Sequence, residues 1–476
     1  MLNTKTISEL KEGYQAKDFT PSDVIESIEG AIAERDDAIG AYLSRNVERA
    51  LEAAQSADLS LPLGGVPIAI KDNINVQGEP CSCASKFLAD AYTAPYNATV
   101  INKLIAAGAI PFGRVNMDEF AMGSATENSA HKITRNPHAP DHIPGGSSGG
   151  SAACVGGDLA IASLGSDTGG SIRQPASHCG VVGFKPSYGR VSRYGLVAFA
   201  SSLDQIGPLT KNVSDAALLT NVLAGHDALD STSLDVASED YTQNLDAGVA
   251  GKKIGVPTEY LSEGLNSDVK ARVQEAIAAL EKEGAEIVEV SLPHTKYCVP
   301  TYYILAPAEA SSNLARFDGV RYGKRSQDVT DVLEMYEKSR VEGFGPEVKR
   351  RILLGTYVLS SGYYDAYYIK AQKVRTLIMK DFEEVFQQVD ALIAPVTPEP
   401  ARKLGVNEHD PLSEYLADIF TIGANLAGIP SISVPCGNVT VDGTSLPVGL
   451  QILGPHLGDS TVLQVARAWE IVRDAQ

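Results

Sequence analysis

The sequence predicts an α/β protein in which a single β-sheet is combined with helices. Helical and strand patterns alternate along the chain, and the strand patterns are short, mostly apolar runs. Repeated alternation of helix and strand is typical of α/β folds. Strand patterns also occur on both sides of a mainly helical segment at about residues 300–386. We therefore expect one domain over residues 1–476, in which this helical segment covers the sheet.

The first third of the chain begins with predicted helices. Residues 20–23 (TPSD) match an N-cap, a proline at the first helical position and an acidic first turn, and apolar residues at helical spacing follow. Residues 63–70 (LGGVPIAI) predict a buried strand that ends immediately before Lys71. The other expected elements here are helices at 46–57 and 99–107 and a strand at 109–113.

The same alternation returns after residue 250. Residues 362–386 predict a long helix whose apolar stripe begins with Tyr364 and Tyr367. Residues 419–441 contain no charge, but their prolines and asparagines favour a helix, a turn and a strand in a protein core over a membrane span. The other expected elements are helices at 267–283 and 461–472, and strands at 252–256, 287–292, 391–394, 431–434 and 448–453.

The composition limits the possible partners and location. The net charge is −19, from 40 basic and 59 acidic residues, so most of the surface would repel a phosphate backbone. We therefore expect any nucleic acid to be held by another chain. The six cysteines form no CxxC motif and no Cys/His set with zinc spacing, which predicts reduced, buried thiols and no metal site. These features favour a soluble, cytoplasmic protein.

Lys71 is the first candidate for chemistry. It follows an apolar strand, and burial of a lysine lowers its pKa by up to about 3–5 units. An uncharged amine can act as a general base near pH 7. The alternative is a surface lysine at the end of a strand, paired with Asp72.

Two glycine–serine clusters, at 145–151 and 168–171, flank an apolar segment and supply the other candidates. Ser171 follows Thr168, Gly169 and Gly170, and consecutive backbone N–H groups in such a segment can bind an oxyanion. The alternative for Ser171 is a helix N-cap in a helix cut short by Pro175. Ser147 lies in the first cluster, where the alternative is a polar turn. Serine hydroxyls on a rigid, glycine-rich frame suit nucleophilic catalysis.

Other motifs are weaker. Residues 167–169 (DTG) resemble half of an aspartic-protease site, but that chemistry needs two carboxylates and no second such motif occurs. His178 and Cys179 are expected on a strand, where neighbouring side chains point to opposite faces, so they predict a core pair. His138 and His142 have helical spacing, but the prolines near them predict a loop.

The chain resembles the amidase signature family over essentially its whole length. The resemblance rests on four stretches: VPIAIKDN, PGGSSGGSAA, SDTGGSIRQPAS and GVVGFKPSYGRVS. It implies a large mixed β-sheet covered by helices on both faces. It also implies that Ser171 is the nucleophile, that Ser147 is a bridging serine at a cis peptide bond, and that Lys71 is the base. The backbone N–H groups of residues 168–171 then line the oxyanion hole.

Further stretches, at 113–130, 189–208, 308–323 and 354–375, resemble glutaminase subunits of tRNA-dependent amidotransferases. This resemblance implies hydrolysis of glutamine through an acyl-enzyme, with the ammonia used for transamidation of misacylated Glu-tRNA(Gln) and/or Asp-tRNA(Asn). It implies a heterotrimer with B and C subunits. The tRNA is then bound mainly through a partner subunit, which also uses ATP and Mg, and this chain holds no cofactor.

The resemblance also implies a pocket for free glutamine. Arg351 matches a residue that binds the α-carboxylate, Asp418 the partner of the α-ammonium, and Tyr302 a hydrogen-bonding group. The choice between Arg350 and Arg351 stays open. One alternative function is a stand-alone amidase of the same family acting on an apolar or aryl amide, which would offer neither Arg351 nor Asp418 a charged group to bind. Another is a non-enzymatic scaffold.

Overall fold

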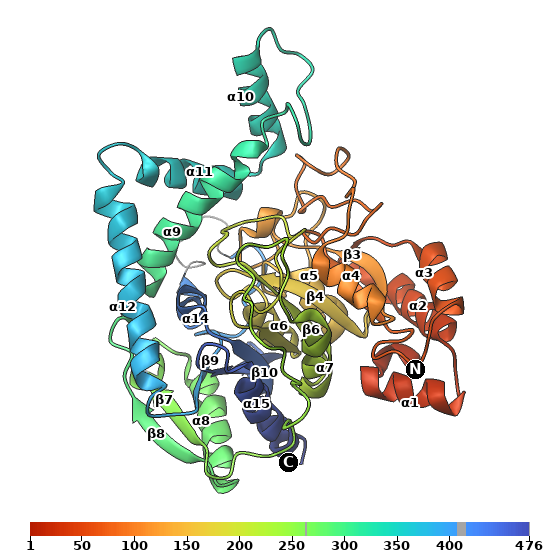
Figure 1. The fold of residues 1–476 in the computed structure, drawn as a ribbon, viewed down its shortest axis with the longest axis vertical. Helices are drawn as coiled ribbons and strands as arrows, with labels where there is room; N and C mark the ends of the chain where they lie inside the picture. Colours follow the sequence, from red (N-terminus) through yellow and green to blue (C-terminus); the bar gives the residue numbers. More distant parts are fainter. Residues whose placement is uncertain (262–263, 407–415, 476) are drawn as a thin grey trace.

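One mixed β-sheet forms the centre of the molecule (Figure 1). The computed structural model describes residues 1–261, 264–406 and 416–475. The strands are β1 (Tyr42–Ser44), β2 (Pro67–Lys71), β3 (Ile110–Val115), β4 (Ala162–Asp167), β5 (Val182–Lys185), β6 (Gln205–Thr210), β7 (Lys253–Pro257), β8 (Glu286–Val290), β9 (Ala391–Pro395), β10 (Ser431–Val441) and β11 (Thr444–Leu453). Their order in the sheet is β1-β3-β2-β4-β6-β5-β10-β11-β9-β7-β8.

The sheet has two parallel parts joined by an antiparallel centre. Strands β3-β2-β4 and β9-β7-β8 are parallel. The strands between them, and β1 at one edge, pair antiparallel. The prediction of an α/β fold with a single mixed sheet is therefore confirmed.

Helices connect most of the strands. The α-helices are α1 (Ile7–Ala16), α2 (Pro21–Ile39), α3 (Val47–Gln55), α4 (Thr99–Ala106), α5 (Gly149–Gly156), α6 (Arg173–Cys179), α7 (Val213–Leu223), α8 (Ser267–Lys282), α9 (Cys298–Asn313), α10 (Val332–Gly343), α11 (Pro346–Leu359), α12 (Lys370–Val385), α14 (Ile422–Ala427) and α15 (Asp459–Asp474). The short 3-10 helices are η1 (Leu2–Thr4), η2 (Glu119–Ala121), η3 (Thr258–Leu261), η4 (Thr295–Tyr297) and η5 (Leu314–Arg316), and η6 (Asp365–Ile369) is a π-turn.

Both faces of the sheet are covered, as the alternation of β9 shows. Ala391 and Ile393 belong to the buried cluster that includes α7, α8 and α15, whereas Leu392 and Ala394 belong to the cluster that includes α9, α12 and α14. Successive residues of a strand point to opposite faces, so these helix groups lie on opposite sides. Figure 1 shows α9, α11 and α12 together at one side of the molecule, with α10 projecting beyond them.

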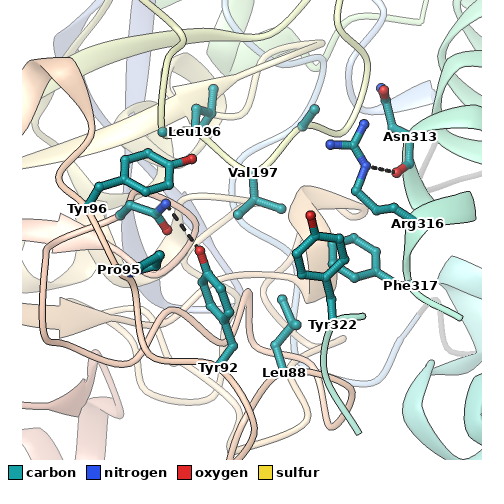
Figure 2. Close-up of a pocket in the computed structure, with 13 residues that line it drawn as sticks. Leu88, Tyr92, Pro95, Tyr96, Leu196, Val197, Asn313, Arg316, Phe317 and Tyr322 are labelled. Atoms are coloured by element: carbon teal, nitrogen blue, oxygen red, sulfur yellow. Dashed lines mark hydrogen bonds between the residues drawn. The ribbon is translucent and has the colours of Figure 1, made fainter. Parts of the chain in front are cut away.

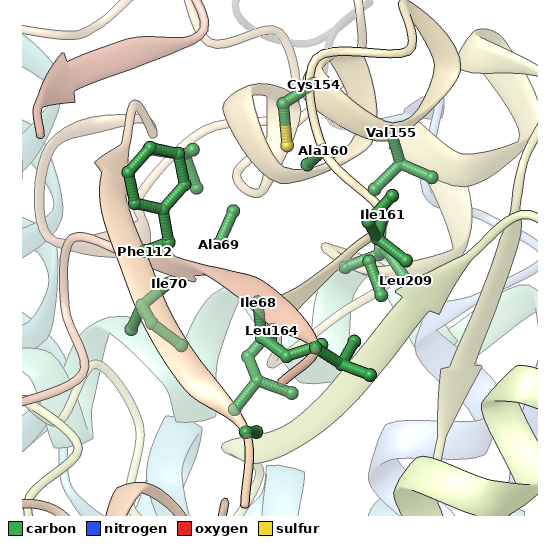
Figure 3. Close-up of a cluster of buried hydrophobic side chains, with 14 of the residues drawn as sticks. Ile68, Ala69, Ile70, Phe112, Cys154, Val155, Ala160, Ile161, Leu164 and Leu209 are labelled. Atoms are coloured by element: carbon green, nitrogen blue, oxygen red, sulfur yellow. The ribbon is translucent and has the colours of Figure 1, made fainter. Parts of the chain in front are cut away.

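Strand β2 leads to the candidate site through a fully apolar environment. Ile68, Ile70 and Leu164 belong to a buried cluster that also includes Phe112 and Val155 (Figure 3). The apolar character of β2 ends at Lys71, its last residue.

Two local predictions are wrong. The expected helix at 362–386 is interrupted, since a π-turn at 365–369 precedes α12, and Tyr364 and Tyr367 are 41% and 39% exposed. A π-turn contains an extra residue, which rotates the preceding side chains away from the stripe that follows. His178 and Cys179 lie at the end of α6 and not on a strand, although both are buried. The division of the chain into one domain stays a prediction.

Several other expectations are confirmed. The capping signal at residues 20–23 is real, because the Thr20 hydroxyl accepts the Asp23 N–H at 3.3 Å at the start of α2. The uncharged stretch at 419–441 contains α14 and β10. Within the described ranges, no helix is long and apolar enough to cross a membrane. All six cysteines are buried and free.

The packing between β5 and the helices gives a stability prediction. The Phe184 side chain has no exposed surface and lies in the cluster of α7, α8 and α15. We expect Phe184→Ala to lower the free energy of unfolding by about 3–5 kcal/mol, because it leaves a cavity in a close-packed core. Leu229→Ala, at a position that is 65% exposed, should change it by less than about 0.5 kcal/mol. Denaturant unfolding followed by circular dichroism measures both, and equal losses would contradict this packing.

Candidate active site

Lys71 ends β2 in the interior of the protein. Its side chain has no exposed surface, and its Nζ lies 2.8 Å from Ser147 Oγ, 2.7 Å from Ser148 Oγ and 3.0 Å from Ser166 Oγ. Asp72 pairs instead with Arg114, whose Nε lies 3.3 Å from the carboxylate. The alternative of a surface lysine paired with Asp72 is therefore wrong.

The surroundings of Lys71 favour an uncharged amine. Burial lowers the pKa of Lys71 to about 7, against the opposing effect of nearby carboxylates, of which Asp118 acts most strongly. The Ser148 hydroxyl donates to the Ser166 carbonyl at 3.0 Å, so Ser148 Oγ can accept from the amine. If Ser148 and Ser166 accept the two N–H groups of a neutral amine, its lone pair is left toward Ser147. The amine can then take a proton from the Ser147 hydroxyl.

The first glycine–serine cluster is held by Asp118 and Thr126. The Gly146–Ser147 peptide bond is cis. The Asp118 N–H donates to the Ser147 carbonyl at 3.2 Å, and the Thr126 hydroxyl donates to the Gly145 carbonyl at 2.8 Å. A Cβ on Gly146 would lie 2.2 Å from the Asp118 carboxylate, so only glycine fits at this close approach.

The second cluster is held by a buried ion pair. Arg173 Nε and Nη2 each lie 3.0 Å from a carboxylate oxygen of Asp167, and neither side chain is exposed. Although burial alone raises it, the Arg173 guanidinium lowers the pKa of Asp167 to about 2. The Asp167 carboxylate also accepts the N–H groups of Gly170 and Ile172, at 2.9 and 3.1 Å. This pair fixes the backbone at 167–173 from below.

The predicted set of oxyanion donors divides in the structure. The Gly170 N–H points to Asp167 and is therefore already bonded. The N–H groups of Gly169 and Ser171 have no protein acceptor among the described residues. Thr168 is fixed through its hydroxyl, which donates to Asp204 at 2.7 Å. Gly169 and Ser171 are thus the better-placed donors for an oxyanion.

Ser171 adjoins the first cluster and reaches the surface. It is 8% exposed, and its carbonyl accepts the Ser148 N–H at 3.2 Å. Helix α6 begins at Arg173 with Ile172 as its N-cap, so Ser171 is not the cap, and Pro175 lies in the first turn, where no N–H is needed. In the described part of the chain no hydrogen bond joins the hydroxyls of Ser147 and Ser171. Catalytic hydrogen bonds commonly tighten only when substrate is bound.

The expected glutamine-binding residues lie around the same loop. Arg351, on α11, is 5% exposed, whereas the Arg350 side chain is 49% exposed, so Arg351 is the inward-facing arginine. The Arg351 guanidinium lies 5.5 Å from the ring centres of Phe199 and Tyr303, and its Nε donates to Glu347 at 2.7 Å.

Tyr302 links these residues to the glycine loop. A Cβ on Gly169 would lie 2.8 Å from the Tyr302 hydroxyl, so the ring packs directly on the loop. Burial raises the pKa of Tyr302, and the charges of Arg351 and Asp418 also act on it. Asp418 is half-buried. The three side chains therefore surround one site next to Ser171.

Sequence reasoning missed several residues of the site. Ser148 and Ser166 contact the Lys71 amine as closely as Ser147 does. Their position among other serines in 147–151 and next to Asp167 offered no means of choosing among them. The charged pair of Asp167 and Arg173 was visible only as two polar residues beside apolar strands.

A separate cavity lies beside the loop that leads to Phe199. It has a volume of about 360 Å³ and contains none of Lys71, Ser147 and Ser171 (Figure 2). Aromatic and aliphatic side chains dominate its wall, among them Leu88, Tyr92, Tyr96, Val197, Phe317 and Tyr322. Among the described residues, no group of three or more His, Cys, Asp or Glu side chains is placed to hold a metal ion.

Comparison with known proteins is consistent with this site. Residues 23–463 match the Amidase family, and the chain therefore belongs to this family. It is 56% identical over 463 residues to the A chain of the Glutamyl-tRNA(Gln) amidotransferase from Akkermansia muciniphila, and the match covers 97% of this chain and 98% of that protein.

Solved structures also resemble the chain. The crystal structure of the corresponding Glutamyl-tRNA(Gln) amidotransferase component from Thermotoga maritima is 43% identical, with a TM-score of 0.82 over 98% of this chain and 94% of that one. A bacterial aryl acylamidase of the amidase signature family is 27% identical, with a TM-score of 0.85 over 98% of this chain and 96% of that one.

The pKa of Lys71 predicts how the site reacts with a covalent probe. We expect the rate at which a fluorophosphonate labels Ser171 to rise with pH and to be half-maximal near pH 7, because the protonated amine below that pH cannot accept a proton. Lys71→Met should slow labelling at least about 100-fold. Lys185→Met is a matched control, since burial also lowers the pKa of Lys185 to about 7 but Lys185 has no role in this relay. Labelling that ignores Lys71 would refute the assignment.

Proposed function

We propose that this protein is the glutaminase subunit of a tRNA-dependent amidotransferase. It hydrolyses glutamine and supplies the ammonia for amidation of misacylated Glu-tRNA(Gln) and/or Asp-tRNA(Asn). The observation that carries the proposal is the buried Lys71 amine, 2.8 Å from Ser147 Oγ and beside the loop at 168–171. Relatives named as components of Glutamyl-tRNA(Gln) amidotransferase support the choice of substrate and assembly.

In the proposed mechanism the proton moves through two hydroxyls. Lys71 takes the proton of Ser147, and Ser147 takes that of Ser171, while Ser171 Oγ attacks the amide carbon of glutamine. The carbonyl oxygen becomes an oxyanion next to the N–H groups of Gly169 and Ser171. The proton then returns to the leaving nitrogen, the C–N bond breaks, and ammonia departs. Water attacks the resulting ester by the same relay and releases glutamate.

Two charged groups select free glutamine. The planar guanidinium of Arg351 suits a two-point bond with the α-carboxylate, and Asp418 suits the α-ammonium. In the absence of such a substrate, Arg351 donates to Glu347, so its charge stays partnered in the interior. An apolar or aryl amide would offer neither Arg351 nor Asp418 a charged group to bind, which disfavours the stand-alone amidase as the function.

The other components belong to partner subunits in this proposal. The B and C subunits complete a cytoplasmic heterotrimer, and the transamidase partner uses ATP and Mg and binds most of the tRNA. The net charge of −19 supports this division, since so acidic a chain would repel the tRNA backbone.

Removal of the nucleophile separates the two half-reactions. We expect Ser171→Ala to reduce ammonia release from glutamine by at least about 10⁴-fold, because no acyl-enzyme can form. The assembled complex should still amidate tRNA when ammonium chloride is supplied, since the transamidase partner is intact. Ser56→Ala, on the exposed end of α3, should leave both reactions unchanged. Retained glutaminase activity in Ser171→Ala would remove this serine from the mechanism.

Neighbouring arginines offer a matched test of substrate binding. We expect Arg351→Ala to raise the KM for glutamine by about 10–150-fold, the value of a lost hydrogen bond to a charged group. Arg350→Ala should change it less than about twofold, because that side chain faces solvent and contributes only a surface ion pair. Steady-state kinetics and thermal unfolding of both variants provide the readout. Equal losses of stability and activity in Arg351→Ala would instead indicate a structural arginine.

A further inference from the structure

Two consecutive acidic residues, Asp118 and Glu119, connect parts of the site that are far apart in the sequence. The Asp118 N–H donates to the Ser147 carbonyl at 3.2 Å, and the Asp118 carboxylate accepts the Thr126 N–H at 2.9 Å. Asp118 therefore holds the loop that contains Ser147. Its neighbour, Glu119, points to a different element.

Glu119 holds the start of α11. Its Oε2 accepts the Gly345 N–H at 2.7 Å, and its Oε1 accepts the Ser85 hydroxyl. The Glu119 side chain is only 2% exposed, and burial raises the pKa of Glu119 to about 7 against these two hydrogen bonds. A buried carboxylate is costly unless donors surround it, so both donors are needed to keep it there. The interaction is thus internal and specific, not a solvated surface contact.

The turn between α10 and α11 is built to receive this carboxylate. Gly345 is the N-cap of α11 and has no side chain to accept its first N–H groups, and an anion at a helix N-terminus is favoured by the helix dipole. A Cβ on Gly345 would lie 2.5 Å from Glu119 Oε2. The ring of Phe344 stacks on Phe87 at 4.9 Å and meets Phe120 edge-on at 5.6 Å. The helix therefore begins at one defined place.

We propose that Glu119 is a positioning residue for substrate binding, which fixes α11 and with it the Arg351 guanidinium relative to the loop of Ser147. The inference rests on the proposed function, since it assumes that Arg351 binds the α-carboxylate of glutamine. Arg351 lies in the second turn of α11, so a shift at Gly345 is transmitted to it through a continuous helix. A displacement of about 1 Å in such a group is enough to cost a large factor in activity.

The test compares two amides in the full-length chain assembled with its partner subunits, at pH 8, where the Glu119 carboxyl is ionised. In Glu119→Gln an amide N–H₂ replaces one acceptor and faces a donor. We expect the KM for glutamine to rise about tenfold with kcat changed less than about twofold. Hydrolysis of butyramide, which has no α-carboxylate, should keep its kcat/KM. Glu337→Gln, on the exposed side of α10, is the matched control and should behave as the unmodified chain.

A second variant guards against a simple folding defect. Gly345→Ala leaves the carboxylate in place but pushes the helix away from it, and should raise the KM for glutamine in the same way while the butyramide rate is kept. An unchanged KM for glutamine in both variants would overturn the inference. So would a parallel loss on both amides together with a lower melting temperature, which would indicate a structural role only. If the unmodified chain releases no ammonia from glutamine, the proposed function itself fails.

Discussion

The structure depends on one constraint: an amine at the end of β2 is enclosed so completely that it loses its charge at neutral pH. Lys71 has no exposed surface, and burial outweighs the attraction of nearby carboxylates on its pKa. In place of an ion pair it has three serine hydroxyls around its Nζ. Hydroxyls can accept the N–H groups of a neutral amine and can also donate to its lone pair, so the same contacts satisfy the amine and prepare it for proton transfer.

Two carboxylates then divide the work of shaping the backbone. Asp118 holds the loop of Ser147, and Asp167, paired with Arg173, holds the loop of Ser171. Both act mainly by accepting backbone N–H groups, a task that requires a charged acceptor in the interior and close approach of glycine. This arrangement explains why the cluster is rich in glycine without being flexible. Since Glu119 follows Asp118 directly, the same short segment also reaches the helix that contains Arg351.

The sequence predicted the frame of the site better than its connections. Apolar runs and caps indicated the strands and helices, and the strand before Lys71 was correctly expected to be buried. The partner of Asp72, by contrast, is Arg114, 42 residues further on, and no local pattern contains that information. The same holds for the Gly170 N–H, which turns to Asp167, and for the contact of Ser148 with Lys71 across 77 residues. Side chains of similar chemistry within one cluster can be assigned only when the tertiary packing is known.

The central claim is that the Lys71 amine is largely uncharged at neutral pH, and a direct titration of that group tests it best. The Cε resonance of Lys71 can be followed between pH 5 and 11 in protein labelled with ¹³C at lysine and assigned by its absence in Lys71→Met. The account predicts a titration midpoint near 7, well below that of the surface lysines. A midpoint near 10.5, the ordinary value for lysine, would contradict it.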